Sequence, residues 1–251
     1  MTLSDLELER YARHIILPDV GGAGQARLKA AQVAMVGAGG LGSAALPCLA
    51  AAGVGRLTLI DDDLVALSNL QRQTLYATSD IGRPKVEVAV ARLSALNPHV
   101  VLHARTVRLT PANAGALLAG HDLVLDGSDS FATRAAVNAA CVALGIPLIA
   151  AAMGPFDGQL GLFAGHLPDA PCWACFAGAA QDRPGETCAE QGVIGALAGM
   201  MGSLQALEAL RYLTGYAPRA FGTLFLFDAK TLATRTVRVA KDPECPVCSS
   251  S

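Results

Sequence analysis

A glycine-rich turn between a predicted strand and a predicted helix constrains the fold of this 251-residue chain more than any other feature. Residues 33–36, VAMV, are typical of a short buried strand, and residues 41–52 are rich in alanine and leucine, as in a buried helix. Between them, Gly37, Gly39 and Gly42 form a G-x-G-x-x-G pattern. Glycines at this spacing permit a tight turn, close approach of the backbone to phosphate, and close helix–strand packing. The turn therefore predicts an anion-binding helix start, as in nucleotide-binding folds.

A second predicted strand ends in a carboxylate that would face the same ligand. Residues 56–60 form a hydrophobic run, and Asp61 follows it, about 20 residues beyond Gly42. An acidic residue at this spacing binds a ribose hydroxyl in dinucleotide-binding folds. A glycine-rich turn without a ligand is the structural alternative, but the two strands and the acid together favour a nucleotide-binding site.

The predicted order of helices and strands indicates an α/β fold. After the first two strands, helices and strands alternate at residues 85–96, 100–107, 111–119, 123–126, 131–144 and 147–152. This alternation implies a doubly wound, Rossmann-like domain with a mainly parallel sheet. The C-terminal third predicts a long helix and more strands, at residues 160–163, 193–213, 223–227 and 234–239, and we expect antiparallel strands that extend the same sheet. We also expect a helix at residues 6–16 and loops at residues 18–24 and 172–185.

Composition argues against two classes of partner. The net charge is −2, so no general basic field supports binding to nucleic acid. Mean hydropathy is +0.40, and two uncharged stretches, residues 30–55 and 135–156, are long enough to span a membrane. The first contains the glycine-rich turn and the second is interrupted by Gly145 and Pro147, so both fit buried α/β elements better. The acidic N-terminus lacks a signal-peptide core, which predicts a cytoplasmic protein.

Four of the seven cysteines form two Cys-x-x-Cys pairs. Cys172 and Cys175 form one pair, and Cys245 and Cys248 form the other. Four thiolates in two pairs are typical of a tetrahedral structural zinc site, which here would join the C-terminal tail to the middle of the chain. For either pair alone, coincidence or a redox function is the alternative.

Cys188 stands apart from these pairs, in the segment ETCAEQGVIG before the long predicted helix. A helix N-terminus lowers the pKa of a nearby thiol and makes it more nucleophilic, so Cys188 is a candidate nucleophile. A structural cysteine is the alternative. Cys48 and Cys141 lie in apolar predicted helices and are expected in the core.

Several charged and polar residues lie on loops that follow predicted strands or at helix starts. They are Asp61, Asp63, Asn69, Arg72, Lys85 and Asp129. The carboxyl ends of strands are the ligand-binding edge of an open α/β sheet. Two cations with carboxylates suit a nucleoside triphosphate with Mg²⁺, although any one of these residues alone would be explained as a solvated loop charge. In the N-terminal helix, a solvated surface is favoured over a helix that donates Arg13 to a site.

Taken in order, the motifs resemble those of the ThiF/MoeB/HesA family, the bacterial relatives of ubiquitin-activating enzymes. The matching segments are ERYARHIILP, GAGGLGS, DDDLVALSNLQRQ, RPK, LVLDGSDS, ETCAEQGVIG and GSLQALEALRYLTG, followed by the two cysteine pairs. The resemblance covers nearly the whole chain. It implies a single adenylation domain, residues 1–251, made of a helical dimerisation and arginine segment (1–30), a nucleotide-binding part (31–155) and a carrier-binding and zinc part (156–251).

The resemblance also implies an activity. Family members use ATP to adenylate the C-terminal glycine of a small ubiquitin-like sulfur carrier protein, and the carrier could be ThiS-like, in thiamine biosynthesis, or MoaD-like, in molybdopterin biosynthesis. Asp61 would bind the ribose, Arg72 and Lys85 the phosphates, and Asp129 Mg²⁺. Arg13 would reach the triphosphate of the other subunit in a homodimer, which reverses the preference stated above.

The site residues implied by the resemblance form three groups. The nucleotide-binding group is Gly37, Gly39, Gly40, Leu41, Gly42, Asp61, Asp63, Asn69, Arg72, Gln73, Lys85 and Asp129. Catalytic roles are expected for Arg13, Arg72, Lys85, Asp129 and Cys188. The zinc ligands would be Cys172, Cys175, Cys245 and Cys248.

Two features depart from a uniform family pattern. Ser130 replaces the asparagine that usually follows the Mg²⁺-binding aspartate, which puts the local geometry in question. The cysteine that matches Cys188 becomes covalently linked to the carrier in some members and is dispensable in others. Some members also carry a C-terminal rhodanese domain, and this chain ends at CSSS, so we expect a separate sulfur donor, a cysteine desulfurase or a rhodanese.

Other functions use parts of the same pattern. An NAD-dependent oxidoreductase could use the glycine-rich turn but has no need of Arg72, Lys85 or Asp129 near a phosphate chain. A non-catalytic scaffold that binds a ubiquitin-like protein would be marked by loss of one of four residues, and all four are present: Arg13, Arg72, Lys85 and Asp129. A tRNA-modifying adenylating enzyme is the remaining alternative within the family, and the low net charge and paired cysteines disfavour it.

Overall fold

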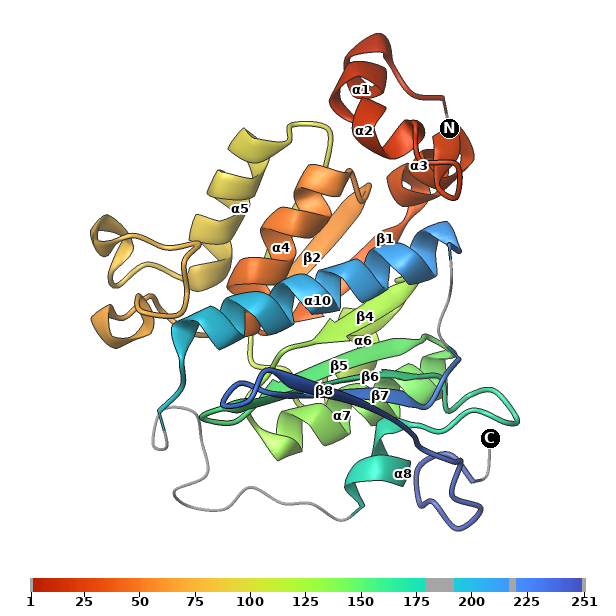
Figure 1. Cartoon of the computed structure of the whole chain (residues 1–251). Coiled ribbons are helices and arrows are strands. Elements are labelled where there is room, and N and C mark those ends of the chain that lie inside the picture. Colours follow the sequence, from red (N-terminus) through yellow and green to blue (C-terminus); the bar gives the residue numbers. More distant parts are fainter. Residues whose placement is uncertain (1, 179–191, 217–219, 250–251) are drawn as a thin grey trace.

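The computed structural model in Figure 1 describes residues 2–178, 192–216 and 220–249. Eight strands form one sheet in the order β3-β2-β1-β4-β5-β6-β7-β8. Their bounds are β1 (Gln32–Val36), β2 (Arg56–Ile60), β3 (Val101–Arg105), β4 (Leu123–Asp126), β5 (Leu148–Met153), β6 (Asp157–Phe163), β7 (Thr223–Asp228) and β8 (Ala233–Arg238).

The sheet combines a parallel and an antiparallel half. Strands β1 to β5 pair in parallel, whereas β6, β7 and β8 pair in antiparallel fashion. The chain builds outward from β1 through β2 to β3, and then returns to place β4 on the other side of β1. This reversal creates a switch point between β1 and β4, where ligands bind in open α/β sheets. The predicted fold class, a mainly parallel sheet with an antiparallel C-terminal extension, is confirmed.

Helices cover both faces of the parallel half (Figure 1). Helices α4 (Gly40–Ala52), α5 (Lys85–Leu96) and α10 (Gly195–Thr214) lie on one face, and α6 (Ala114–Leu118) and α7 (Phe131–Leu144) lie on the other. Strand β4 shows the consequence, since Leu123 and Leu125 enter one core cluster while Val124 enters the other. Strands buried on both faces are apolar throughout, which explains the uncharged stretches of the sequence.

Helix α10 lies directly against α4, and Gly202 permits this contact. A Cβ atom at Gly202 would collide with the carbonyl oxygen of Leu41 in the first turn of α4. The close approach brings the long helix of the C-terminal part onto the helix that follows the glycine-rich turn (Figure 1).

Three helices precede the sheet, α1 (Asp5–Arg10), α2 (Ala12–Ile15) and α3 (Gly21–Ala30). The prediction of a loop at residues 18–24 is wrong in part, because α3 begins within it. Glycines in α3 lower its intrinsic helix propensity. Tertiary contacts stabilise the helix instead: Leu28 is buried, and Gln25 donates a 2.8 Å hydrogen bond to the carbonyl oxygen of Ala52.

A partly buried ion pair joins α1 to α3. Lys29 Nζ lies 2.7 Å from Glu7 Oε2, and Ser4 forms a capping box with Glu7 at the start of α1. Burial raises the pKa of Glu7, but the hydrogen bonds from Lys29 and Ser4 outweigh burial and lower this pKa to about 2. The single helix predicted at residues 6–16 is divided into α1 and α2 at Tyr11, whose hydroxyl accepts a 2.8 Å hydrogen bond from Asn97 Nδ2.

The remaining differences from prediction are local. Cys141 is buried as expected, but the prediction of a core position for Cys48 is wrong, because Cys48 is exposed on α4. The predicted loop at residues 172–185 contains a short helix, α8 (Trp173–Ala177), and residues 179–185 lie outside the described part of the chain. Two 3-10 helices, η1 (Leu67–Asn69) and η2 (Thr78–Asp80), lie between β2 and α5. Where the structure describes the chain, every helix is too short or too polar to cross a membrane.

Candidate functional site

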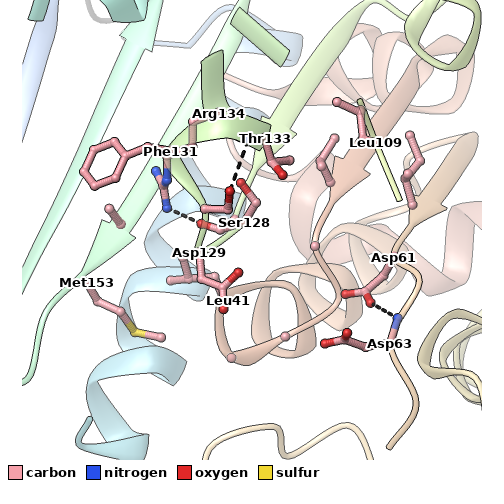
Figure 2. Close-up of a pocket in the computed structure, with 18 of the residues that line it drawn as sticks. Leu41, Asp61, Asp63, Leu109, Ser128, Asp129, Phe131, Thr133, Arg134 and Met153 are labelled. Carbon is pink, nitrogen blue, oxygen red and sulfur yellow. Dashed lines mark hydrogen bonds between the residues drawn. The ribbon is translucent and has the colours of Figure 1, made fainter. Parts of the chain in front are cut away.

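A cleft of about 800 Å³ opens at the carboxyl ends of the parallel strands (Figure 2). Its walls come from the ends of β1, β2 and β5, the loop after β4, and the first turns of α4, α5 and α7. The cleft therefore spans the switch point between β1 and β4, the edge at which open α/β sheets bind ligands.

The glycine-rich turn forms the floor of this cleft. At two of its glycines, a side chain would clash with neighbouring backbone atoms. Gly37 has a φ of 89°, and a Cβ atom there would lie 2.9 Å from the carbonyl oxygen of Gly127. A Cβ atom at Gly42 would collide with the carbonyl oxygen of Gly37. Gly40 and Leu41 line the cleft at the start of α4, where a helix presents N–H groups without intrahelical partners. The turn thus offers backbone donors to an anion.

Asp61 supports the turn and faces the cleft. Its Oδ2 accepts a 2.7 Å hydrogen bond from the N–H of Ala38, and its Oδ1 accepts a 2.8 Å hydrogen bond from the N–H of Asp63 (Figure 2). Burial raises the pKa of Asp61, while the nearby Lys85 charge and these two N–H groups act to lower it. The carboxylate is therefore fixed in orientation at the end of β2, where a ribose hydroxyl would donate to it.

Lys85 is the most deeply buried cation of the cleft. Its side chain is 3% exposed, and its Nζ lies 2.7 Å from Asp63 Oδ2, on a side chain that is 65% exposed. Arg72 also lines the cleft and donates a 3.0 Å hydrogen bond to the carbonyl oxygen of Ser68. The buried Gln73 Oε1 has no hydrogen-bond partner among the described residues. Lys85, Arg72 and Gln73 thus present two positive charges and an unused acceptor to a ligand.

The loop after β4 carries Asp129, an exposed residue that lines the cleft. Its neighbour Ser128 is held on both sides: the N–H of Ser128 donates a 2.9 Å hydrogen bond to Asp126 Oδ1, and Arg134 donates one to the Ser128 carbonyl oxygen (Figure 2). Ser130 caps α7, because its side chain accepts from the N–H of Thr133. Serine is as good an N-cap as asparagine, so the helix start tolerates this departure from the family pattern.

The structure brings most of the predicted site residues to this one cleft. The predicted residues that line it are Gly37, Gly39, Gly40, Leu41, Asp61, Asp63, Asn69, Arg72, Gln73, Lys85 and Asp129. Gly42 packs beneath the turn instead. Arg13 lies on α2, one of the three N-terminal helices, and does not line the cleft. Cys188 lies outside the described residues.

The cleft also contains residues that the sequence analysis did not predict. Arg108 follows β3, Arg134 lies on α7, and Met153, Asp157 and Gln159 come from the β5–β6 hairpin. Arg134 lies five residues beyond Asp129, and a helix of that length brings such a residue back toward the loop that precedes it. This spacing is the one sequence signal that could have indicated it.

The four paired cysteines form a separate cluster. The Sγ atoms of Cys172 and Cys245 are 3.7 Å apart, those of Cys175 and Cys248 are 3.5 Å apart, and all four lie within 4.8 Å of one another. A tetrahedral ion with bonds of about 2.3 Å to four thiolates would place the sulfur atoms about 3.8 Å apart. Asn138 Nδ2 also lies 3.5 Å from the Cys172 Sγ, as a donor. The four thiols therefore have an arrangement that could hold one tetrahedral metal ion.

Comparison with known proteins gives a family and close relatives. The sequence model described as the ThiF family matches residues 11–247. The sulfur carrier protein adenylyltransferase of Thermus thermophilus is 49% identical over 249 residues, which cover 96% of this chain and 91% of the relative. From Escherichia coli, molybdopterin-synthase adenylyltransferase is 44% identical, with 98% of each chain covered, and sulfur carrier protein ThiS adenylyltransferase is 45% identical, with 99% and 98% covered.

A solved structure supports the fold independently of the sequence. The crystal structure of E. coli MccB with MccA-N7isoASN has a TM-score of 0.84 to this chain at 21% sequence identity. The match covers 98% of this chain and 75% of that chain. The sheet order and the helices on both faces are thus those of a known Rossmann-type architecture.

Proposed function

The chain belongs to the ThiF family, and from this premise we propose that it uses ATP and Mg²⁺ to adenylate the C-terminal glycine of a small ubiquitin-like sulfur carrier protein, with release of pyrophosphate. The relatives named for molybdopterin synthase and for ThiS are about equally similar to this chain. Both a ThiS-like and a MoaD-like carrier are therefore candidates, in thiamine or in molybdopterin biosynthesis.

One observation carries this proposal: a single cleft combines the glycine-rich turn with Arg72, Lys85 and Asp129. Asp61 holds the ribose, and the N–H groups at the start of α4 hold phosphate oxygens. Arg72 and Lys85 offset the charge that gathers on the phosphates as the carrier carboxylate attacks the α-phosphate. Asp129 binds Mg²⁺, which supplies additional positive charge to the triphosphate. The protein thus acts by positioning and charge neutralisation.

The alternative functions have less support. A nicotinamide-dependent oxidoreductase gives no role to the two cations and Asp129, and the relatives described above are named adenylyltransferases. A scaffold without catalysis gives no reason to keep Lys85 almost fully buried beside the turn.

We also propose that the active unit is a homodimer in which Arg13 serves the partner's cleft. Helix α2 follows α1 and packs against α3, which leads into the N-terminal end of β1, whereas the cleft lies at the carboxyl ends of the strands. Helix α2, which carries Arg13, is therefore separated from the ligand-binding edge of the sheet, and Arg13 does not line the cleft of its own subunit. A symmetric dimer can present such a residue to the neighbouring site.

We assign the cysteines two roles, zinc binding and acceptance of the activated carrier. The four-cysteine cluster binds zinc and fastens the C-terminal tail. Among the described residues, no cysteine lines the cleft, which supports a separate protein, a cysteine desulfurase or a rhodanese, as the sulfur donor. Cys188 is our candidate to accept the activated carrier or its sulfur. The described cysteines are all free thiols, which supports a location in the reducing cytoplasm.

Carrier-dependent exchange of labelled pyrophosphate into ATP tests the proposed function. The wild-type protein is incubated with ATP, Mg²⁺ and pyrophosphate, with a ThiS-like carrier, a MoaD-like carrier or neither. Exchange that requires one of the carriers supports adenylation and identifies the pathway. Absence of exchange with both carriers would refute the proposal.

A further inference from the structure

Arg134 is a buried cation in the cleft wall without a carboxylate partner. The residue is 8% exposed and is the fourth residue of α7, yet it lines the cleft. Its guanidinium group donates to the Ser128 carbonyl oxygen (Figure 2). Within the described part of the chain, no carboxylate forms an ion pair with Arg134. Asp126 accepts from the N–H of the same Ser128, but it forms no ion pair with Arg134 either.

This arrangement differs from that of Lys85 and Asp80, two other buried charges of the described residues, whereas Asp126 is likewise buried without an ion pair. Lys85 pairs with Asp63, and the buried Asp80 pairs with both Arg83 and Arg92. A buried charge is costly unless it is paired. An arginine has five N–H donors, and the bond to a single carbonyl oxygen leaves most of them for another group. The unpaired charge of Arg134 therefore indicates that an anionic group of a ligand binds beside it in the cleft.

The position of Arg134 indicates which anion this is. Across the sheet, the ends of β2 and β1 carry Asp61 and the glycine-rich turn, which form the nucleotide arm of the cleft. A second arm continues past β4 to β5 and β6, where Met153, Asp157 and Gln159 line it. Arg134 and Asp129 lie where the two arms meet (Figure 2).

We propose that Arg134 binds the C-terminal carboxylate of the carrier and holds it beside the α-phosphate. This inference rests on the proposed function and assigns it a carboxylate-binding residue. In the reaction, a carboxylate oxygen forms a bond to the α-phosphorus, and the bond from that phosphorus to the bridging oxygen breaks. The electron pair leaves with pyrophosphate, so Arg134 transfers no proton.

Two physical reasons favour an arginine here. Its planar guanidinium group matches a carboxylate with two parallel hydrogen bonds, which fixes the direction of approach. Its charge also offsets the repulsion between the carboxylate and the phosphates as they come together. The bond to Ser128 at the same time couples the bound carboxylate to the loop that carries Asp129.

A purely structural role is the competing explanation, in which Arg134 only fixes the Ser128 carbonyl. The two explanations differ in one measurable property, the dependence of carrier affinity on the charge of the carrier's C-terminus. The test uses the carrier that supports exchange, prepared with a C-terminal carboxylate or with an uncharged C-terminal carboxamide. Binding to wild-type protein and to Arg134→Gln is measured by calorimetry with Mg²⁺ and a non-hydrolysable α,β-methylene analogue of ATP.

We expect the wild-type protein to bind the carboxylate form about tenfold more tightly or better, as for a charge-assisted hydrogen bond. Arg134→Gln should bind the two forms within about twofold of each other, with affinity for the ATP analogue changed by less than about threefold. Arg134→Lys, which keeps the charge but not the planar pair of donors, should show an intermediate preference. Arg56→Gln, at the opposite end of the strands, is the control and should keep the full wild-type preference.

Equal affinity of the wild-type protein for the two carrier forms would overturn the proposal, even if Arg134→Gln fails to fold. So would an Arg134→Gln protein that keeps the preference but binds the ATP analogue poorly, because that result assigns Arg134 to the loop alone. The wild-type exchange assay separates the two hypotheses. Exchange without a carboxylate preference refutes only the role of Arg134, whereas absence of exchange with both carriers refutes the proposed function and this inference with it.

Discussion

The cleft and the cysteine cluster each collect residues from distant parts of the chain, but they are built in opposite ways. The cleft is open, with an exposed Asp129, a Gln73 oxygen without a partner and an Arg134 without a counterion among the described residues. The cluster is closed: Cys172, Cys245 and Cys248 are fully buried, and their sulfur atoms already lie at the separations of one tetrahedral site. Unmatched groups suit a site that receives substrates, whereas a complete set of ligands suits a site that holds the fold.

Substitution of Lys85 should give the largest effect, and it should fall on catalysis alone. We expect Lys85→Met to lower carrier-dependent pyrophosphate exchange by about 10³-fold, because it removes a buried charge aimed at the phosphates. Lys29→Met is a matched control, since Lys29 forms an ion pair of the same length, 2.7 Å, with Glu7 outside the cleft. That variant should lose stability but keep exchange per folded molecule. Equal losses of exchange in both variants would contradict the distinction between the two regions.

Disruption of the cysteine cluster should give a loss of similar size, confined to stability. A zinc ion there would close a loop of about 70 residues between the two cysteine pairs, and a cross-link over such a loop contributes about 4 kcal/mol. Cys172→Ser, or chelation of the wild-type protein, should therefore lower the free energy of unfolding by about this amount and remove the bound zinc. Metal analysis and denaturant titration measure both quantities.

The exposed Cys48 provides a control for the zinc prediction. Cys48→Ser should keep one zinc ion per chain and the stability of the wild type. A freshly purified wild-type protein without zinc would refute the metal assignment.

Removal of Arg13 should have a smaller effect on catalysis than removal of Lys85. Arginines that act from a neighbouring subunit contribute up to about 10³–10⁵ in phosphoryl-transfer rates. Here attack is at the α-phosphate, so we expect Arg13→Ala to lower exchange by about 10²-fold while the dimer persists.

Mixed dimers show whether Arg13 acts across the interface. When Arg13→Ala and Lys85→Met subunits exchange at random, half of the dimers are mixed, and each mixed dimer has one site with both residues intact. Exchange activity should return to about a quarter of the wild-type value. No recovery, with subunit exchange confirmed by native mass spectrometry, would place Arg13 in its own subunit's site or in none.

The smallest effect should come from the ion pair of Glu7 and Lys29. The lowered pKa of Glu7, about 2 against an ordinary value of 4.5, means that its contribution to stability is present above pH 4.5 and is lost as the pH falls toward 2. Between pH 6 and pH 3, the wild-type protein should lose about 1–2 kcal/mol more stability than Glu7→Gln. Urea titrations at the two pH values measure this difference, and identical pH dependence in both proteins would contradict it.

The parts of the fold that were predicted correctly are those encoded by local patterns. The glycine-rich turn and Asp61 follow from spacing. The contact of Gly42 with Gly37 is local, whereas the contact of Gly37 with Gly127 depends on the sheet. Helix α3 was missed because it depends on distant partners, such as the carbonyl oxygen of Ala52, that outweigh the low helix propensity of its glycines.

In the candidate site, too, some residues could be predicted from local sequence patterns and others depend on contacts between distant segments. Asp63 and Lys85 follow strand ends or begin helices, so their positions could be predicted from the order of elements. Arg134 lies within a mostly apolar helix, and its spacing from Asp129 is the one feature of the sequence that could have marked it as a residue of the cleft. Its significance depends on burial against Ser128 and on the absence of a carboxylate partner among the described residues, which only the three-dimensional structure shows.

The most direct test of adenylation is the mass of the carrier itself. The wild-type protein is incubated with ATP, Mg²⁺ and the ThiS-like or MoaD-like carrier, and the intact carrier is analysed by mass spectrometry. We predict a gain of one adenylyl group on the C-terminal glycine, which is absent when that glycine is deleted and when Lys85→Met replaces the wild-type enzyme. If both carriers remain unmodified, or if the adenylyl group is found at any other residue, the account is contradicted.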